Sequence, residues 1–88
     1  MNKKLIIVDD DAPFRDRLKR SMEKKGFIVE AFSNTNQSIK RCNEIFFDYA
    51  IVDMRLEDGS GLELIKKIKQ INSLTKSLLL TGYGNIAT

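Results

Sequence analysis

LIIVDDD, residues 5–11, is the stretch that decides the fold, because four apolar residues run directly into three carboxylates. A second stretch, YAIVD at residues 49–53, repeats the pattern with one aspartate. Short apolar runs rich in β-branched residues are typical of strands buried on both faces of a parallel sheet. Ligands of open parallel sheets bind outside the carboxyl ends of the strands. We therefore expect the aspartates of both stretches to converge on one small crevice.

Asp9, Asp10 and Asp53 would repel one another in such a crevice, because neighbouring like charges disfavour each other's ionised form. A bound divalent cation relieves this repulsion, and a set of oxygen-only ligands suits Mg²⁺ or Mn²⁺. The sequence therefore predicts an acidic, metal-assisted site for phosphate chemistry. For Asp11 the simpler interpretation is the N-cap of the helix that follows.

Strand and helix patterns alternate along the whole chain, with no linker and no internal repeat. Such alternation implies right-handed βαβ units, so we expect an α/β fold: a doubly wound parallel sheet with helices on both faces and strand order 2-1-3-4. Thr81, directly after the fourth strand, then lies at the same edge as the aspartates. The expected strands are residues 4–8, 28–31, 49–52 and 77–80. The expected helices begin near residues 12, 34 and 61, and residues 85–88 could open a fourth helix.

Each expected helix carries an apolar stripe at helical spacing. The stripes are Phe14, Leu18 and Met22 in the first helix, Ile39, Cys42 and Phe46 in the second, and Leu62, Ile65 and Ile68 in the third. Residues 54–60 are expected to form a loop in which Glu57 and Asp58 are solvated charges. Gly59 and Gly61 would meet the needs of a turn and of helix entry.

Bulk composition narrows the class of protein. The 88 residues suffice for one domain. No stretch approaches the roughly 20 apolar residues of a membrane span, and the N-terminal apolar run is too short for a signal peptide, so we expect a cytoplasmic protein. The single cysteine, Cys42, excludes an internal disulfide and is most simply a small buried hydrophobe. The absence of histidine removes the usual general base.

The net charge of +3 comes with lysines and arginines concentrated on the first and third expected helices. Two solvated helix faces are the simplest interpretation, and docking to an acidic protein partner is the functional alternative. Direct binding to nucleic acid is not expected, because no aromatic residues interleave with the basic ones and no helix-turn-helix or zinc pattern is present.

Four features in order carry a family resemblance: the acidic pair Asp9 and Asp10, then Asp53, Gly61 and Thr81. With them, the chain resembles the receiver domain of bacterial two-component response regulators, the CheY-like variety of the flavodoxin-like fold. The stretches VDMRLEDGSGL at residues 52–62 and LTGYGNIAT at residues 80–88 are most similar to the RegA/PrrA/ActR type of redox-responsive transcription regulators.

The resemblance implies a mechanism. Asp53 would accept a phosphoryl group from the phosphohistidine of a sensor histidine kinase, and the Thr81 hydroxyl would hydrogen-bond that group and carry the switch. Mg²⁺ would be bound by Asp9, Asp10 and Asp53, together with the backbone carbonyl of Arg55. Such a domain labels itself once from a donor and is not a turnover enzyme.

The resemblance also implies that the chain is a receiver domain truncated after the fourth strand. The family continues through a fourth helix, a fifth strand that carries a lysine, and a fifth helix, and an effector domain that binds DNA would follow. Without these elements, residues 78–80 become an uncovered edge strand, and exposed apolar edges pair with other chains. We therefore expect self-association.

Two other functions stay open from the sequence. The first is a truncated interaction or dimerisation fragment that cannot be phosphorylated, because the lysine is missing. The second is a metal-dependent phosphohydrolase of related topology. That class normally has a second aspartate two residues after its nucleophile, where this chain has Arg55, so the phosphohydrolase is the weaker alternative.

Overall fold

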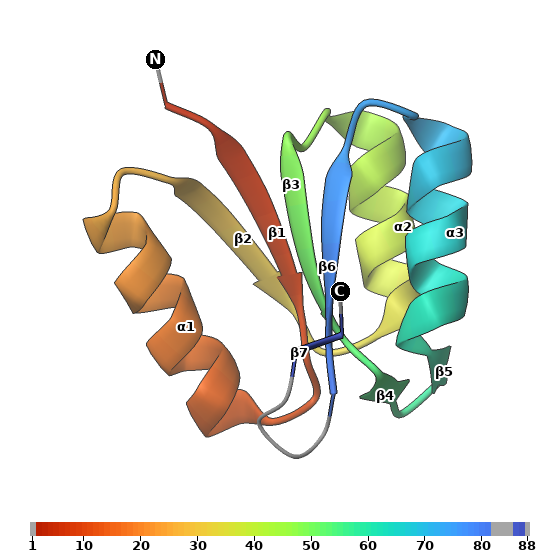
Figure 1. Ribbon diagram of the computed structural model, residues 1–88, viewed down its shortest axis with the longest axis horizontal. Helices are drawn as coiled ribbons and strands as arrows, with labels where there is room; N and C mark the ends of the chain where they lie inside the picture. The colour runs from red at the N-terminus through yellow and green to blue at the C-terminus, as the bar shows by residue number, and fades with distance from the viewer. Residues whose placement is uncertain (1, 82–85, 88) are drawn as a thin grey trace.

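The centre of the structure, a computed structural model that describes residues 2–81 and 86–87, is a sheet of five strands (Figure 1). Their order is β2-β1-β3-β6-β7. The first four strands of that order are parallel, so the expected order 2-1-3-4 is confirmed, with β6 as the expected fourth strand. The strands are β1 (Lys4–Val8), β2 (Ile28–Phe32), β3 (Tyr49–Asp53), β6 (Lys76–Leu80) and β7 (Ile86–Ala87).

Helices cover both faces of the sheet, as Figure 1 shows. Helix α1 (Ala12–Lys24) lies on one side, and α2 (Thr35–Glu44) and α3 (Gly61–Ile71) lie next to each other on the other side. Alternate residues of β1 point to opposite faces. Leu5 and Ile7 therefore pack with α1, whereas Ile6 and Val8 pack toward α2 and α3. No helix in the described part of the chain is long and apolar enough to cross a membrane.

Local signals in the sequence fix both ends of α1, the helix that follows β1. The Asp11 carboxylate accepts a hydrogen bond from the Phe14 backbone N–H at 3.1 Å, so Asp11 is the N-cap, as expected. Pro13 lies within the first turn, where its missing N–H costs nothing. Gly26 ends the helix with a φ of 101°, a conformation that favours glycine. Because Asp11 is the N-cap, α1 begins directly after Asp9 and Asp10.

Two of the expected apolar stripes are wrong in part. Phe46 is 41% exposed, because α2 ends at Glu44 and the helical spacing does not extend to it; Phe47 is buried in its place. Leu62 is 48% exposed, because the face of α3 that meets the sheet runs through Gly61, Leu64 and Ile68.

The chain between β3 and α3 is more regular than the expected loop. Strands β4 (Arg55–Leu56) and β5 (Gly59–Ser60) pair antiparallel as a small hairpin. Leu56 is almost fully buried against the α2 and α3 side of the core. The hairpin is therefore anchored to the body of the domain, directly after Asp53.

The expectation of a fully uncovered β6 edge needs correction. β7 pairs antiparallel with β6, opposite Leu79 and Leu80. The possible helix over residues 85–88 is therefore wrong for Ile86–Ala87, while 85 and 88 lie outside the described residues. The outer edge of β6 stays open only toward its start, where no described strand pairs on that side with Lys76, Ser77 or Leu78.

Candidate functional site

Three aspartates meet at the edge of the sheet to which the parallel strands point, the lower edge in Figure 1. Asp9 directly follows β1 and Asp53 ends β3, and these strands pair with Val8 opposite Val52. Asp10 is next in the chain. One carboxylate oxygen from each of the three lies within 4.8 Å of the others. The structure thus brings together Asp9, Asp10 and Asp53, as expected from strands whose carboxyl ends share one edge.

Asp9 is held from several directions. Its side chain and backbone are 5% exposed, and its backbone N–H donates to the Phe32 carbonyl at 3.0 Å. Its carboxylate accepts from the Asp11 backbone N–H at 2.9 Å. The Arg15 guanidinium donates to the Asp9 carbonyl at 2.8 Å. Asp10 is exposed and Asp53 half-buried, so the cluster opens to solvent on the side of Asp10.

The electrostatics of the cluster are unfavourable without a counter-ion. Burial raises the pKa of Asp53, and the nearby charges of Asp10 and Asp11 raise it further, while hydrogen bonds from the backbone N–H groups of Met54 and Arg55 oppose the rise. Burial also raises the pKa of Asp9, and the carboxylates of Asp53 and Asp10 add to the effect. Each carboxylate therefore resists ionisation beside the others.

The donor set fits a divalent cation of the Mg²⁺ or Mn²⁺ class. All three side chains offer hard oxygen ligands, which these ions prefer. Within residues 2–81, no lysine or arginine forms an ion pair with the three carboxylates. The negative charge is thus left uncompensated by the side chains that the structure describes, and a cation would relieve it.

The two remaining predicted site residues lie at the same edge. Leu80, the last residue of β6, is opposite Asp53, so Thr81 begins one residue beyond Asp53 on the neighbouring strand. Thr81 is half-buried. Arg55 starts β4 two residues after Asp53, and its partner across the hairpin is Ser60. Both are thus close along the backbone to the aspartate cluster.

Gly61 fixes the distance between α3 and the end of β3. A Cβ atom at this position would collide with the backbone carbonyl of Asp53 and lie 3.1 Å from Leu79 Cδ1. The Gly61 N–H donates to the Met54 carbonyl at 2.8 Å, and the Met54 N–H donates to the Leu80 carbonyl at 2.8 Å. Glycine is therefore required here for close backbone approach, which differs from the expected role in helix entry alone.

Sequence reasoning missed one contact of this region. Asp58, expected to be a solvated charge, accepts hydrogen bonds from the backbone N–H groups of Thr35 and Asn36. No local pattern could reveal it, because the partners are 22 and 23 residues away in the sequence.

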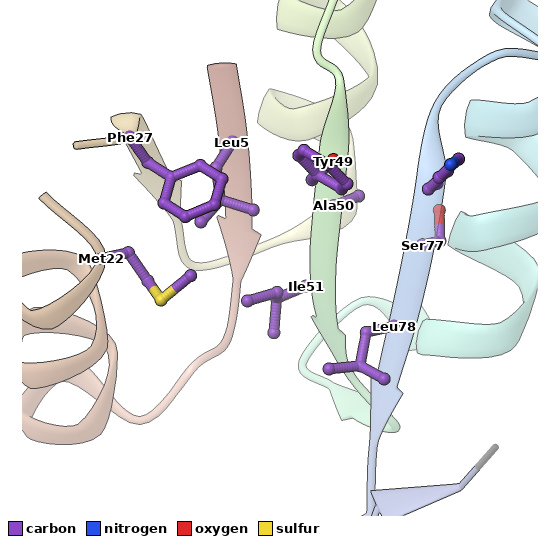
Figure 2. Close-up of a pocket in the computed structure, with 9 residues that line it drawn as sticks. Leu5, Met22, Phe27, Tyr49, Ala50, Ile51, Ser77 and Leu78 are labelled. Carbon is purple, nitrogen blue, oxygen red and sulfur yellow. The ribbon is translucent and has the colours of Figure 1, made fainter. Parts of the chain in front are cut away.

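An apolar hollow of about 260 Å³ lies away from the aspartates, between α1 and the sheet (Figure 2). Met22 and Phe27 approach it from the α1 side, while Tyr49, Ile51 and Leu78 line it from β3 and β6. Its lining is mostly apolar, although it also includes Lys76 and Ser77, and none of the three aspartates contributes to it.

Comparison with known proteins gives a consistent result. The family described as "Response regulator receiver domain" matches residues 5–88. Over 87 residues, the chain is 45% identical to the acid tolerance regulatory protein ActR of Rhizobium meliloti and 39% identical to the photosynthetic apparatus regulatory protein RegA of Cereibacter sphaeroides. Each alignment covers 99% of this chain but only 45% and 47% of those proteins. The chain therefore spans about half the length of the curated relatives it matches.

Solved structures show the same fold. A CheY-like receiver domain protein from Methanospirillum hungatei superposes with a TM-score of 0.90 at 30% identity, covering 97% of this chain and 68% of the other. A response regulator from Burkholderia pseudomallei, solved with a phosphorylated aspartic acid, a calcium ion and citrate, superposes with a TM-score of 0.87 at 30% identity. That alignment covers 93% of this chain and 48% of the other.

Proposed function

The chain belongs to the family of response regulator receiver domains, and from this premise we propose that Asp53 is the acceptor of a phosphoryl group from a sensor histidine kinase. It is a receiver domain of the two-component type, related to ActR and RegA. Receiver domains are generally not turnover enzymes, and the proposed reaction labels the chain once per donor. The proposal includes the cytoplasmic location expected from the sequence.

The observation that carries the proposal is the clustering of Asp53 with Asp9 and Asp10 at the carboxyl edge of the sheet. Asp53 is half-buried, so its carboxylate is accessible to a donor while the strand behind it is fixed in the core. The response regulator from Burkholderia pseudomallei, which was solved with a phosphorylated aspartic acid, supports this proposal.

In the proposed reaction, a carboxylate oxygen of Asp53 forms a bond to phosphorus while the bond from phosphorus to the donor nitrogen breaks. Asp9, Asp10, Asp53 and the backbone carbonyl of Arg55 would hold Mg²⁺, which supplies neutralising charge for the carboxylates and the phosphoryl oxygens. The Thr81 hydroxyl donates to a phosphoryl oxygen. An added charge of about −1.5 to −2 beside that hydroxyl then shifts the local structure.

The experiment is phosphorylation of the purified chain by a small phosphodonor with Mg²⁺, followed by mass spectrometry. We expect about one phosphoryl group per chain, located on Asp53, and none when the metal is chelated. Continuous consumption of the donor would support the phosphohydrolase instead. Absence of any label would support the interaction fragment that cannot be phosphorylated.

Control of transcription is proposed only for a longer protein that carries this domain. ActR and RegA are regulatory proteins about twice as long as this chain. Contacts to DNA would then come from a region outside these 88 residues.

Self-association of this chain is the second part of the proposal. Leu78 is 36% exposed and lines the apolar hollow, and the outer edge of β6 beside it has no described strand as a partner. We expect sedimentation velocity to show dimers or larger species as the concentration rises, and Leu78→Lys to return the chain toward monomer. Leu62→Lys, an exposed position on the opposite face, is the matched control. A compact monomer at high concentration would contradict this part.

A further inference from the structure

The turn of the β4–β5 hairpin is fastened to the beginning of α2 by one side chain. The two carboxylate oxygens of Asp58 accept hydrogen bonds from the Thr35 backbone N–H at 2.9 and 3.1 Å. The second of these oxygens also accepts from the Asn36 N–H at 3.2 Å. We call this set of hydrogen bonds the Asp58 clasp.

The clasp fills a need that α2 cannot meet alone. The first N–H groups of a helix have no partner within the helix. Asn34, the N-cap, accepts from the Gln37 N–H at 3.0 Å, and Asp58 supplies the acceptor for Thr35 and Asn36. A carboxylate at this end is also favoured by the helix dipole. A hydrogen bond from the Thr35 side chain, together with those from the Thr35 and Asn36 backbone N–H groups, lowers the pKa of Asp58, so the carboxylate is negatively charged at neutral pH.

The base of the same hairpin lies next to the end of β3, where Asp53 is located. Arg55 pairs with Ser60 and Leu56 with Gly59 across the two strands. Next to the hairpin, the Gly61 N–H donates to the Met54 carbonyl. The backbone of Arg55 therefore lies between two anchors, the end of β3 on one side and the Asp58 clasp on the other.

We propose that Asp58 is a positioning residue: by tying the hairpin to α2, it holds the backbone of Arg55 in the place where its carbonyl can bind a cation beside Asp53. The inference rests on the proposed function, because it takes the Arg55 carbonyl as one of the metal ligands. Asp58 itself touches neither the metal nor the phosphoryl group.

The test is a Mg²⁺ titration of the full chain and of Asp58→Asn, together with the rate of phosphorylation by a small donor. Outer groups that orient ligands typically contribute 10–100-fold to metal affinity. We expect about tenfold weaker Mg²⁺ binding in Asp58→Asn, and a phosphorylation rate within about twofold of the original at saturating Mg²⁺. Glu57→Gln, which removes the neighbouring exposed carboxylate, should change neither. Asp58→Glu should restore most of the affinity.

Two results would overturn the inference. The first is an unchanged Mg²⁺ affinity in Asp58→Asn. The second is a slower phosphorylation of Asp58→Asn that saturating Mg²⁺ does not restore and that accompanies a loss of stability. This second result would show that Asp58 only stabilises the fold. Failure of the original chain to bind Mg²⁺ would instead remove the proposed function itself, so the two failures are distinguishable.

A second measurement needs no variant. Coupling between two sites is reciprocal, so Mg²⁺ binding should tighten the clasp if the clasp supports Mg²⁺ binding. We expect the Thr35 and Asn36 amides to exchange hydrogen several-fold more slowly when Mg²⁺ is added. Exchange that is unchanged at these two amides, in a chain that does bind Mg²⁺, would overturn the inference even if Asp58→Asn did not fold.

Discussion

Asp53→Asn is expected to abolish phosphorylation of the chain and, at the same time, to stabilise its metal-free form at neutral pH. The first effect follows because the amide lacks the anionic oxygen that would bond to phosphorus. The second follows because the substitution removes one of three carboxylates whose oxygens lie within 4.8 Å of one another. At pH 7, we expect a gain of about 1 kcal/mol in the free energy of unfolding, since single substitutions that improve the arrangement of charges commonly yield about 0.5–2 kcal/mol.

The pH dependence of that gain has a definite sign. Burial, with the charges of Asp10 and Asp11, raises the pKa of Asp53 in the folded state. The folded state therefore binds a proton more readily than the unfolded state. The stabilisation that comes from protonated Asp53 is fully present below the pKa of this carboxyl in the unfolded chain, near 4. It is lost as the pH rises through the pKa of Asp53 in the folded state. Asp53→Asn has no carboxyl group at this position and does not lose stability in this way. The difference in the free energy of unfolding between Asp53→Asn and the original chain should therefore shrink as the pH falls toward about 4.

Chemical denaturation with and without Mg²⁺ measures these effects, and mass spectrometry measures the label. A ligand that binds only the folded state stabilises it, so Mg²⁺ should raise the stability of the original chain more than that of Asp53→Asn. Asp16→Asn, an exposed carboxylate on α1, is the control and should change neither labelling nor the response to Mg²⁺. Undiminished labelling of Asp53→Asn would show that the acceptor is another residue.

Gly61→Ala is expected to produce the second large effect, a loss of about 3 kcal/mol in the free energy of unfolding. The added methyl group would collide with the backbone carbonyl of Asp53, which cannot rotate away as the end of a flexible side chain could. Forcing extra atoms into a packed site usually costs 1–3 kcal/mol. For a domain of this size, the midpoint of thermal unfolding should fall by about 12–24 °C. Mg²⁺ binding should weaken as well, because the end of β3 must shift.

Gly26→Ala is the matched control for that substitution. Gly26 has a φ of 101°, but a Cβ atom there would meet nothing within 4 Å. Its cost is therefore only that of the left-handed conformation, about 1–2 kcal/mol. Because Gly26 lies at the far end of α1, Mg²⁺ affinity should stay unchanged. Equal losses of stability and of Mg²⁺ affinity in both variants would show that close approach of Gly61 to Asp53 does not organise the site.

The aspartate cluster could be predicted because its cause is simple. An apolar run that ends in carboxylates places them at the carboxyl end of a buried strand, and β1 and β3 are neighbours in the sheet. Asp11 was recognisable as an N-cap for a similar reason, because its partner Phe14 is only three residues away. Both signals lie within a few consecutive residues, so they can be recognised without knowing how the elements pack.

Other features depended on how whole elements pack. Gly61 looked like a helix-entry residue, yet it is needed because α3 approaches the Asp53 carbonyl. Phe46 and Leu62 fit a helical stripe but face solvent, since the end of α2 and the direction of α3 decide which side chains meet the sheet. The β7 strand forms because it pairs with β6, and no sequence pattern within residues 85–88 predicts this pairing.

From its own pattern, the sequence determined the alternating elements, the order of the parallel strands and the meeting of Asp9, Asp10 and Asp53, because apolar runs mark buried strands and right-handed βαβ connections bring the carboxyl ends of those strands to one edge. Only the tertiary structure decided the close contact at Gly61, the Asp58 clasp and the partial cover of β6. Each of these joins segments far apart in the chain or depends on how tightly two elements pack. Such contacts exist only once the helices have taken their places on the sheet.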